Sequence, residues 1–338
     1  MQRLVDKRGQ AKQIICDKRL DHSGWTPKAL NCLTDLVARV PLEESAQIAG
    51  NFGLKISSSE LDRLQRPYAE ACQSEVTTKL LTCLETEPVF SAHLPTQRSG
   101  RVMVLQIDGV YVLGQPEQGV CPGLELKTAV LYPQDAPSQR FMLADRCSAE
   151  DFLPLLPGLL ERASVTPADT LLGLGDGAIW IDNIFQHLQA IRITDVYHAV
   201  KYLDTVMQAL AWDEATRAKH RRSWYRGEVD ARDWLAQHLP DVDVWFAWDE
   251  DTRRALHYLE TRLDSMAYAH FKENDYPIGS GQVEAMNKHV IGTRMKRSGM
   301  HWSETGAKSM ASLRAQTCAK HSLIDFQHLR HDAYPAPA

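Results

Sequence analysis

Three acidic residues stand in local contexts that suit metal binding. Asp108 ends the apolar, strand-like run VMVLQIDGV, and Asp176 follows a second such run in LLGLGDGAIW. Glu284 lies just inside an expected helix in YPIGSGQVEAMNKHV. Carboxylates held together repel one another unless a cation neutralises them. Two Mg²⁺ or Mn²⁺ ions, about 4 Å apart, are the usual arrangement for in-line attack on a phosphodiester. We therefore predict Asp108, Asp176 and Glu284 to be catalytic metal ligands; the alternative for each acid is an ordinary turn or helix cap.

Polar residues that follow these acids suit a supporting role. Asn287 and Lys288 come three and four residues after Glu284, so they share its helix face and are suited to bind phosphate oxygens. The alternative is a surface ion pair between Glu284 and Lys288. Asp195 and His198, in DVYHA, form a second polar pair, which we predict to support the site by holding a phosphate or orienting a carboxylate. A buried, structurally satisfied Asp–His hydrogen bond is the alternative.

A basic segment follows the glutamate, although the whole chain has a formal net charge of −5. From Met286 to Lys320 there are seven Lys or Arg and one acid, a balance that favours phosphate binding at this place in the chain. We predict DNA-phosphate contacts for Arg294, Lys296 and Arg297. Trp302 is expected to pack this segment down, with stacking on an unpaired base as the alternative. If the segment binds nothing, it is a solvated helix face.

The N-terminal part of the chain is expected to be helical and to precede the sheet. Residues 1–25 are polar and basic and are predicted to be a flexible arm. Residues 26–95 show helix starts at Thr26-Pro27 and at Ser57, where Ser57 and Glu60 match a capping box. This pattern is typical of a helix-turn-helix DNA-binding region, and equally of helical hairpins that bind nothing.

Residues 100–200 change to an alternating pattern of strands and helices. Three strands, a helix, a strand, a helix and a strand follow one another, an order that predicts a ribonuclease-H-like α/β core with a mixed five-stranded sheet. Residues 273–320, which carry Glu284, are assigned to the same catalytic core. Residues 201–272 interrupt it as an all-helical insertion, because a strand-to-helix connection normally takes only a few residues. The tryptophans of this insertion are expected to be core anchors; the alternative is base stacking.

The cysteines and the hydropathy pattern point to the cytoplasm. The chain has 338 residues and seven cysteines without a CxxC pair, which argues against a zinc ribbon or a disulfide framework. There is no signal-peptide pattern and no run of 18 apolar residues, so no membrane partner is expected.

Taken together, the strings IDG, GDGAIWI, DVYHA, YPIGSGQVEAMNK and RMKRSGMHWS resemble bacterial insertion-sequence transposases of the ISKra type. These are DDE transposases related in their catalytic core to the Mutator-like superfamily, and the resemblance spans residues 24–314. It implies that Asp108, Asp176 and Glu284 are the DDE triad and that Asp195 and His198 form the Asp-x-x-His element beside it.

The resemblance implies a two-metal enzyme that cleaves DNA at transposon ends and transfers the strand into target DNA. The expected partners are double-stranded DNA and further copies of the chain, in a cytoplasmic, nucleoid-associated protein. The chain departs from the family in its short N-terminal region, which lacks the paired cysteines that members commonly carry. A truncated or domesticated copy that only binds DNA is therefore one alternative, and a ribonuclease-H-like, structure-specific nuclease is another.

Overall fold

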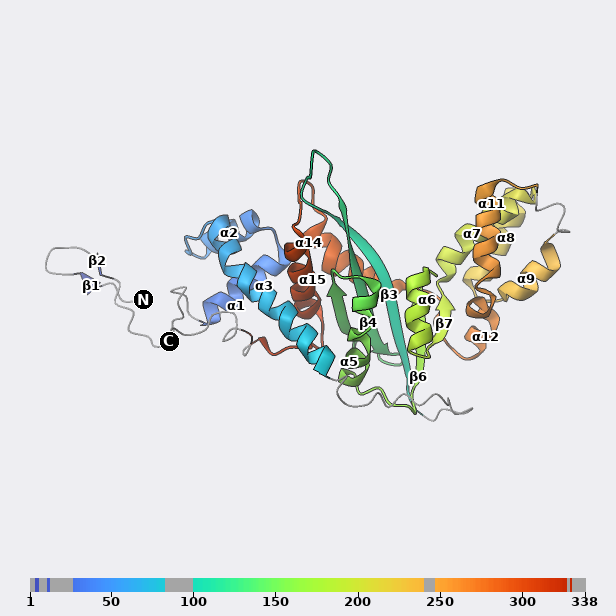
Figure 1. Cartoon of the computed structure of the whole chain (residues 1–338), viewed down its shortest axis with the longest axis horizontal. Coiled ribbons are helices and arrows are strands. Elements are labelled where there is room, and N and C mark those ends of the chain that lie inside the picture. Colours follow the sequence, from blue (N-terminus) through green and yellow to red (C-terminus); the bar gives the residue numbers. More distant parts are fainter. Residues whose placement is uncertain are drawn as a thin grey trace.

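The computed structural model describes residues 4–5, 11–12, 27–82, 100–239, 247–326 and 329. Two short strands, β1 (Leu4–Val5) and β2 (Ala11–Lys12), pair antiparallel near the N-terminus. Most of the predicted basic arm lies outside the described residues. In the rest of the chain, the N-terminal helices, a central sheet and a second group of helices follow one another along the long axis of the molecule (Figure 1).

The centre is a mixed sheet of five strands in the order β5-β4-β3-β6-β7. The strands are β3 (Val102–Leu113), β4 (Gly123–Pro133), β5 (Phe141–Asp145), β6 (Thr170–Gly175) and β7 (Ile191–Thr194). The first three form an antiparallel meander, and β6 and β7 run parallel to β3. Helices α4 (Ala149–Phe152), α5 (Leu155–Arg162) and α6 (Ile179–His187) connect the later strands. The predicted mixed α/β class and five-stranded sheet are confirmed.

The sheet is buried on both faces because its strands alternate between two apolar cores. Val104 of β3 and Leu174 of β6 belong to the core that includes residues of α7 (Val196–Ala209) and α13 (Gly281–Met286). Leu105 and Ile107 belong to the opposite core, with α3, α5 and α6. Gln106 and Asp108 share the face of Val104, since side chains two residues apart point the same way. Asp108 is therefore directed to the layer that holds α7 and α13.

Three helices precede the sheet: α1 (Pro27–Arg39), α2 (Leu42–Asn51) and α3 (Ser58–Leu81). Ser57 caps α3 as its pattern indicates, because its hydroxyl oxygen accepts a hydrogen bond from the Glu60 amide at 3.1 Å. The last long helix, α15 (Glu304–Cys318), contacts both α3 and β5, so it joins the N-terminal helices to the sheet (Figure 1).

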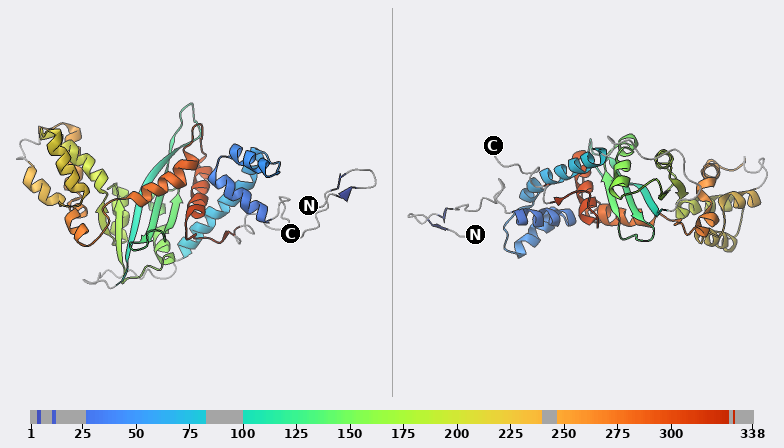
Figure 2. Two further views of the ribbon diagram at one scale, coloured as in Figure 1. Left: turned by 180° about the vertical axis from the view of Figure 1, so that it is seen from behind. Right: turned by 90° about the horizontal axis from the view of Figure 1, so that it is seen from below.

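A second group of helices lies beyond β7, on the side of the sheet away from α1–α3 (Figure 2). It comprises α7, α8 (Glu214–Tyr225), α9 (Ala231–His238), α11 (Glu250–Glu260), a 3₁₀ turn η2 (Leu263–Met266) and α12 (Tyr268–Glu273). Trp224 and Trp234 are 0% and 2% exposed and meet edge to face, which is the anchoring role expected of them. Trp245 lies outside the described residues.

The chain returns to the sheet through α13, which continues as a π-helical stretch, η3 (Asn287–Gly292), and then α14 (Thr293–Met295). Glu284 lies on α13 and Asn287 begins the π-helical stretch. Single π turns inside α-helices are frequent at functional sites because they redirect side chains locally. Within the part of the chain that the structure describes, no helix is both long and apolar enough to cross a membrane.

Candidate metal centre

The two aspartates that we predicted at strand ends occupy neighbouring places at one edge of the sheet. Asp176 directly follows β6, whereas Asp108 lies inside β3, which continues beside β4 as far as Leu113. The parallel register pairs Gln106 of β3 with Leu174 of β6, so Asp108 and Asp176, two residues further along, follow on the same face. Burial raises the pKa of Asp108, and the nearby negative charge of Asp176 adds to this. The backbone therefore brings together two carboxylates, and the charge of Asp176 disfavours the charged form of Asp108.

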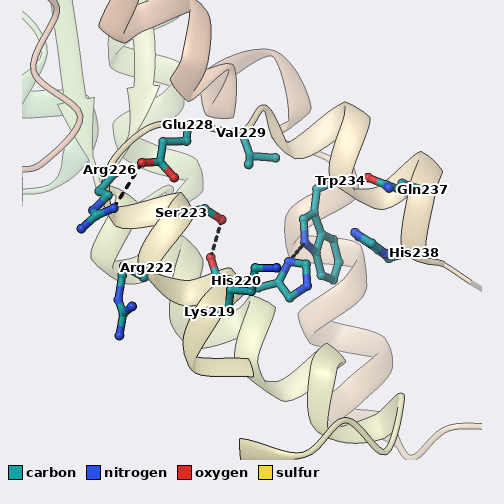
Figure 3. A pocket seen from close by; sticks show the side chains of 10 residues that line it. All are labelled: Lys219, His220, Arg222, Ser223, Arg226, Glu228, Val229, Trp234, Gln237 and His238. Atoms are coloured by element: carbon teal, nitrogen blue, oxygen red, sulfur yellow. Dashed lines mark hydrogen bonds and ion pairs between the residues drawn. The ribbon is translucent and has the colours of Figure 1, made fainter. Parts of the chain in front are cut away.

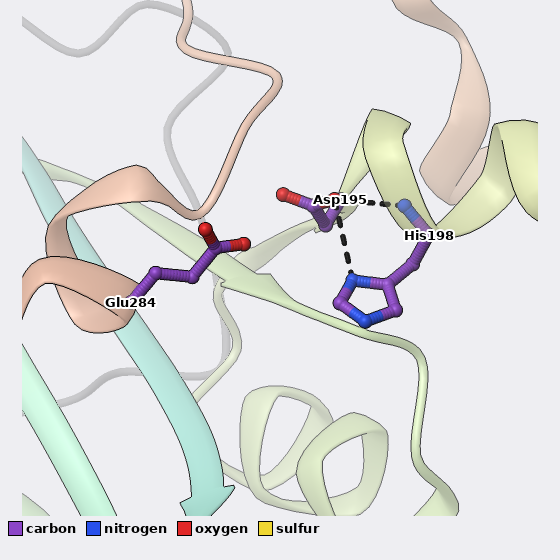
Figure 4. A group of neighbouring side chains, drawn as sticks. All are labelled: Asp195, His198 and Glu284. Atoms are coloured by element: carbon purple, nitrogen blue, oxygen red, sulfur yellow. Dashed lines mark hydrogen bonds and ion pairs between the residues drawn. The ribbon is translucent and has the colours of Figure 1, made fainter. Parts of the chain in front are cut away.

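An Asp–His–Glu group lies at the same edge, after β7. Asp195, His198 and Glu284 each offer one ligand atom, and these atoms lie within 4.8 Å of one another (Figure 4). Asp195 is fully buried and caps α7, where its Oδ1 accepts a hydrogen bond from the His198 amide at 2.9 Å. The His198 Nδ1 atom is 3.4 Å from the same oxygen. The strand end and the helix cap together fix the position of this pair.

Ser280 joins Asp195 to the glutamate. Its amide and its hydroxyl donate to Asp195 Oδ2 at 2.6 and 2.7 Å, and its Oγ lies 3.3 Å from Glu284 Oε1. Burial acts to raise the pKa of Asp195, but the hydrogen bonds from His198 and Ser280 outweigh it and lower that pKa to about 2. The neighbouring Asp195 carboxylate in turn raises the pKa of His198. The pair is thus held as a carboxylate beside an imidazole that binds its proton more tightly than usual.

Asn287 connects the glutamate-bearing helix to the first aspartate. Its Nδ2 donates to Asp108 Oδ2 at 2.6 Å, while the Gly109 amide donates to Asp108 Oδ1 at 2.8 Å. The Asn287 Oδ1 atom is buried and has no hydrogen-bond partner among the described residues. Two hydrogen bonds therefore orient the Asp108 carboxylate, and the buried Asn287 Oδ1 acceptor lies beside it.

The predicted Asp108–Asp176–Glu284 set is not the tightest cluster at this edge. Within the described ranges, Asp195–His198–Glu284 is the one trio whose ligand atoms all lie within 4.8 Å. The Glu284 side chain lies near Ser280, whose Oγ is 3.3 Å from Glu284 Oε1. Lys288 is exposed, and the described residues include no ion pair within 4 Å between it and Glu284.

The donors at this edge fit a hard divalent cation. They are carboxylate oxygens with one imidazole, and oxygen donors are the ligands that Mg²⁺ and Mn²⁺ prefer. The unpaired, buried Asn287 Oδ1 and the raised pKa of Asp108 are both features that a nearby positive charge would relieve. Among the described residues, Asp195, His198 and Glu284 offer the ligand atoms that lie close enough together to share such an ion.

The glycines that follow the two aspartates, Gly109 and Gly177, lie against protein side chains. A β-carbon at Gly109 would meet the Glu125 carboxylate at 2.6 Å, and one at Gly177, where φ is +83°, would meet Arg262 and Tyr258. Both glycines therefore admit neighbouring protein side chains.

Two residues of the helical region hold the turn after β6. The Tyr258 hydroxyl donates to the Asp176 carbonyl at 2.5 Å, and Arg262 donates twice to the Gly177 carbonyl, at 3.0 and 2.5 Å. The Arg262 guanidinium also lies over the Tyr258 ring. No local pattern in the sequence marks these residues, because their function depends on contacts between positions about 85 residues apart.

The basic segment after Glu284 has a buried part and an exposed part. Arg294 is 3% exposed, donates to the Val37 carbonyl at 3.0 Å and lies over the Trp302 ring. Burial lowers the pKa of Arg294 to about 10. Arg294 thus fastens α1 in place of the phosphate contact that we expected of it, since a buried guanidinium is shielded from DNA. Trp302 has the packing role, and its Nε1 donates to the Met295 carbonyl at 2.9 Å.

Lys296 and Arg297 remain exposed, and Arg297 pairs with Glu44 of α2 at 2.8 Å. Arg297 borders a groove of about 750 Å³ between α2, α3 and residues 297–303. The groove has mixed charge, because Asp62 and Glu70 line it together with Arg66 and Arg297. A smaller pocket of about 330 Å³ lies between α8 and α9 and is lined by His220, Trp234 and His238 (Figure 3).

Comparisons with known proteins leave the chain without a family assignment. No family model matches it, and no curated protein matches it. Among solved structures, it is similar to a chain of the Mos1 strand transfer complex, with 12% sequence identity over 77% of this chain and 81% of that chain. The TM-score of 0.18 is too low for this similarity to carry an argument.

Proposed function

We propose that this chain is a DDE transposase with a ribonuclease-H-like core. The observation that supports it is the arrangement around this sheet edge: β3, which carries Asp108, pairs parallel with β6, which Asp176 follows, and Asn287, three residues after Glu284, donates to Asp108. The proposal also rests on the sequence resemblance to insertion-sequence transposases of the ISKra type. In this view residues 100–200 and 273–320 form the catalytic core, 201–272 the helical insertion, and 26–95 a DNA-binding region.

The reaction is metal-dependent cleavage of DNA at transposon ends, followed by strand transfer into target DNA. Two Mg²⁺ or Mn²⁺ ions held by Asp108, Asp176 and Glu284 would activate the attacking oxygen and neutralise charge on the phosphate. Asn287 holds Asp108 in one orientation, and Ser280 places Glu284 near Asp195. His198, whose pKa is raised, is suited to donate a hydrogen bond to a phosphate oxygen, and Lys288 offers a second cation. Several copies of the chain are expected to act together on double-stranded DNA.

The test is cleavage by variants that remove one charge without changing size. Asp108→Asn, Asp176→Asn and Glu284→Gln should each abolish Mg²⁺-dependent cleavage of a plasmid carrying the DNA that flanks the gene, and leave DNA binding intact. Asp251→Asn, which alters an exposed acid of α11, is the matched control and should cleave normally. Full cleavage by any of the three site variants would contradict the assignment.

The same assay separates the alternatives. Cleavage without joined products would indicate a ribonuclease-H-like nuclease. DNA binding without metal-dependent cleavage in the wild-type chain would indicate a copy that only binds DNA.

A further inference from the structure

Two half-exposed tyrosines meet beside the candidate metal centre. The rings of Tyr197 (α7) and Tyr225 (α8) are 56% and 41% exposed, with centroids 5.1 Å apart and planes tilted by 33°. Tyr197 stands between Asp195 and His198 in the sequence, and a β-carbon at Gly279, just before Ser280, would lie 3.3 Å from its ring. An aromatic surface open to solvent therefore borders the centre directly.

A row of cations continues from this aromatic pair along α8. Lys219, Arg222 and Arg226 are spaced by three and four residues, so they share one helix face, and all three are exposed. Arg222 and Arg226 project together, away from Trp234 and His238 (Figure 3). In sequence, Tyr225 directly precedes Arg226 and follows Arg222 by one turn.

The charge of this row is largely unneutralised. Arg226 has an exposed partner, Glu228, at 3.5 Å, and among the described residues neither Lys219 nor Arg222 has an acid within 4 Å. The other two arginines of α8, Arg217 and Arg221, are by contrast paired with Asp204 and Glu214. The helix thus separates structural cations on one side from free cations on the other.

We propose that this surface binds an unpaired DNA strand adjoining the phosphate that is cut, with one base stacked on the Tyr197–Tyr225 pair and its phosphates on Lys219, Arg222 and Arg226. The inference rests on the proposed function, because the strand is assigned to the same metal centre. Aromatic faces next to cations fit single strands, since every base has a π-face that becomes available once it leaves the duplex. A duplex offers phosphates but no free base to the tyrosines.

The aromatic part is tested by binding of two fluorescent DNAs in buffer without divalent cations: a blunt duplex, and the same duplex with a short single-stranded tail. The wild-type chain should bind the tailed DNA more tightly. Tyr197→Ala and Tyr225→Ala should each weaken binding of the tailed DNA by at least about five-fold and leave the blunt duplex unaffected. Tyr197→Phe and Tyr225→Phe keep the ring and should behave as wild type.

The cationic part is tested by the salt dependence of tailed-DNA binding. Replacing Lys219, Arg222 and Arg226 together by Gln should flatten the log–log slope by about two, at roughly 0.7 per single-strand contact. Arg232→Gln with Arg254→Gln is the control, because these exposed arginines of the same region are paired with acids and should leave the slope unchanged.

Equal binding of blunt and tailed DNA by the wild-type chain, or alanine variants that bind the tail normally, would overturn this inference. Failure of the surface is distinguishable from failure of the proposed function. If Asp108→Asn abolishes cleavage while the tyrosine variants bind normally, the surface alone is wrong. If the wild-type chain never cleaves but the tyrosine effect is present, the DNA surface stands and the enzyme assignment falls.

Discussion

At the scale of single residues, Asn287 is the side chain that ties the two halves of the candidate centre together. It donates to Asp108 while standing one helical turn after Glu284. Asn287→Ala should therefore lower Mg²⁺-dependent cleavage by about 10- to 100-fold and raise the Mg²⁺ concentration needed for half-maximal rate, as loss of a ligand-orienting partner usually does. A Mg²⁺ titration of initial cleavage rates checks this.

Gln282 of α13 provides the control for that experiment. It contacts Arg140 by a side-chain hydrogen bond of 3.0 Å and touches none of the site carboxylates. Gln282→Ala should leave the Mg²⁺ requirement unchanged. An Asn287→Ala enzyme with the wild-type Mg²⁺ curve would show that Asp108 needs no such support.

The role of a residue could be predicted from the sequence where its position on a strand decides that role. Asp108 ends the apolar run within β3 and Asp176 follows β6, so the parallel register of these strands brings the two residues to neighbouring places. Arg294 was misassigned because its burial depends on the Val37 carbonyl, 257 positions earlier. The bonds of Ser280 to Asp195 likewise depend on a contact over 85 positions. Such contacts leave no local periodicity to detect.

At the scale of elements, the π-helical stretch η3 depends on one buried arginine. Arg314 of α15 donates to the carbonyls of His289 and Val290 in η3 and of Ala38 at the end of α1. Buried carbonyls without donors are costly, so this guanidinium holds three chain segments in register. A charged residue within the small and apolar run MASLRAQTC was a signal for this role that charge counting overlooked.

Arg314→Met should consequently destabilise the protein by about 2–4 kcal/mol, because it leaves several buried carbonyls unpaired. The urea midpoint of unfolding measures this. Arg39→Met is the matched control: Arg39 is exposed and paired only with Asp35, and such surface pairs contribute at most about 1 kcal/mol. Similar midpoints for the two variants would mean that η3 is held by its own helix contacts.

The pairing of α8 with α9 should weaken in acid. Burial lowers the pKa of His220 and of His238 below the ordinary value of 6.5, and His238 and Lys219 add to this at His220. Arg222 and Arg226 also line this pocket, with Glu228 as its one acid. The Trp234 Nε1 donates to His220 Nδ1 at 3.1 Å, a bond that requires an unprotonated nitrogen.

The direction in which stability changes with pH follows from proton uptake. Below about pH 6.5 both histidines of the unfolded chain bind protons, whereas the native protein disfavours protonation of these histidines. The stabilisation is therefore fully present above that pH, and it is lost as the pH falls through the lowered pKa values. Thermal melting at pH 8 and pH 5.5, followed by tryptophan fluorescence, should show this loss. His220→Gln with His238→Gln should reduce the difference between the two pH values; an unchanged difference would place the acid sensitivity elsewhere.

At the scale of the whole molecule, the N-terminal helices and the second helical group flank the sheet on opposite sides, so duplex DNA bound at the centre has cations available on both. After the correction at Arg294, Lys296 and Arg297 are the exposed pair on the N-terminal side. Their joint replacement by Gln should flatten the log–log salt slope of duplex binding by at most about two, at roughly 0.9 per phosphate contact.

Arg294→Met gives the contrast for that measurement. It should lower the melting temperature and leave the slope unaltered, because Arg294 is buried against Val37 and Trp302. If Lys296 and Arg297 can be neutralised with no change in slope, the duplex runs along another surface.

The architecture of the sheet was largely predictable, and the placement of the N-terminal helices was not. The order of strands and helices along the chain follows from apolar runs and turn signals, which are local. Residues 26–95 read as a separate region because their helix pattern is self-contained. In the structure Tyr68, Cys72 and Val76 of α3 belong to the same apolar core as Leu159 and Leu313, so α3 is part of the body that carries the sheet.

This packing has a consequence for how the protein is made. Helix α15 packs against α3, and the ribosome adds it only after the sheet and the second group of helices. At the usual pace of synthesis, the apolar side of α3 waits roughly ten to fifty seconds for this neighbour. During that interval Tyr68, Cys72, Val76 and Leu80 lack α15 and much of the core that buries them. A newly made chain of this protein should therefore engage folding chaperones through α3 until α15 emerges.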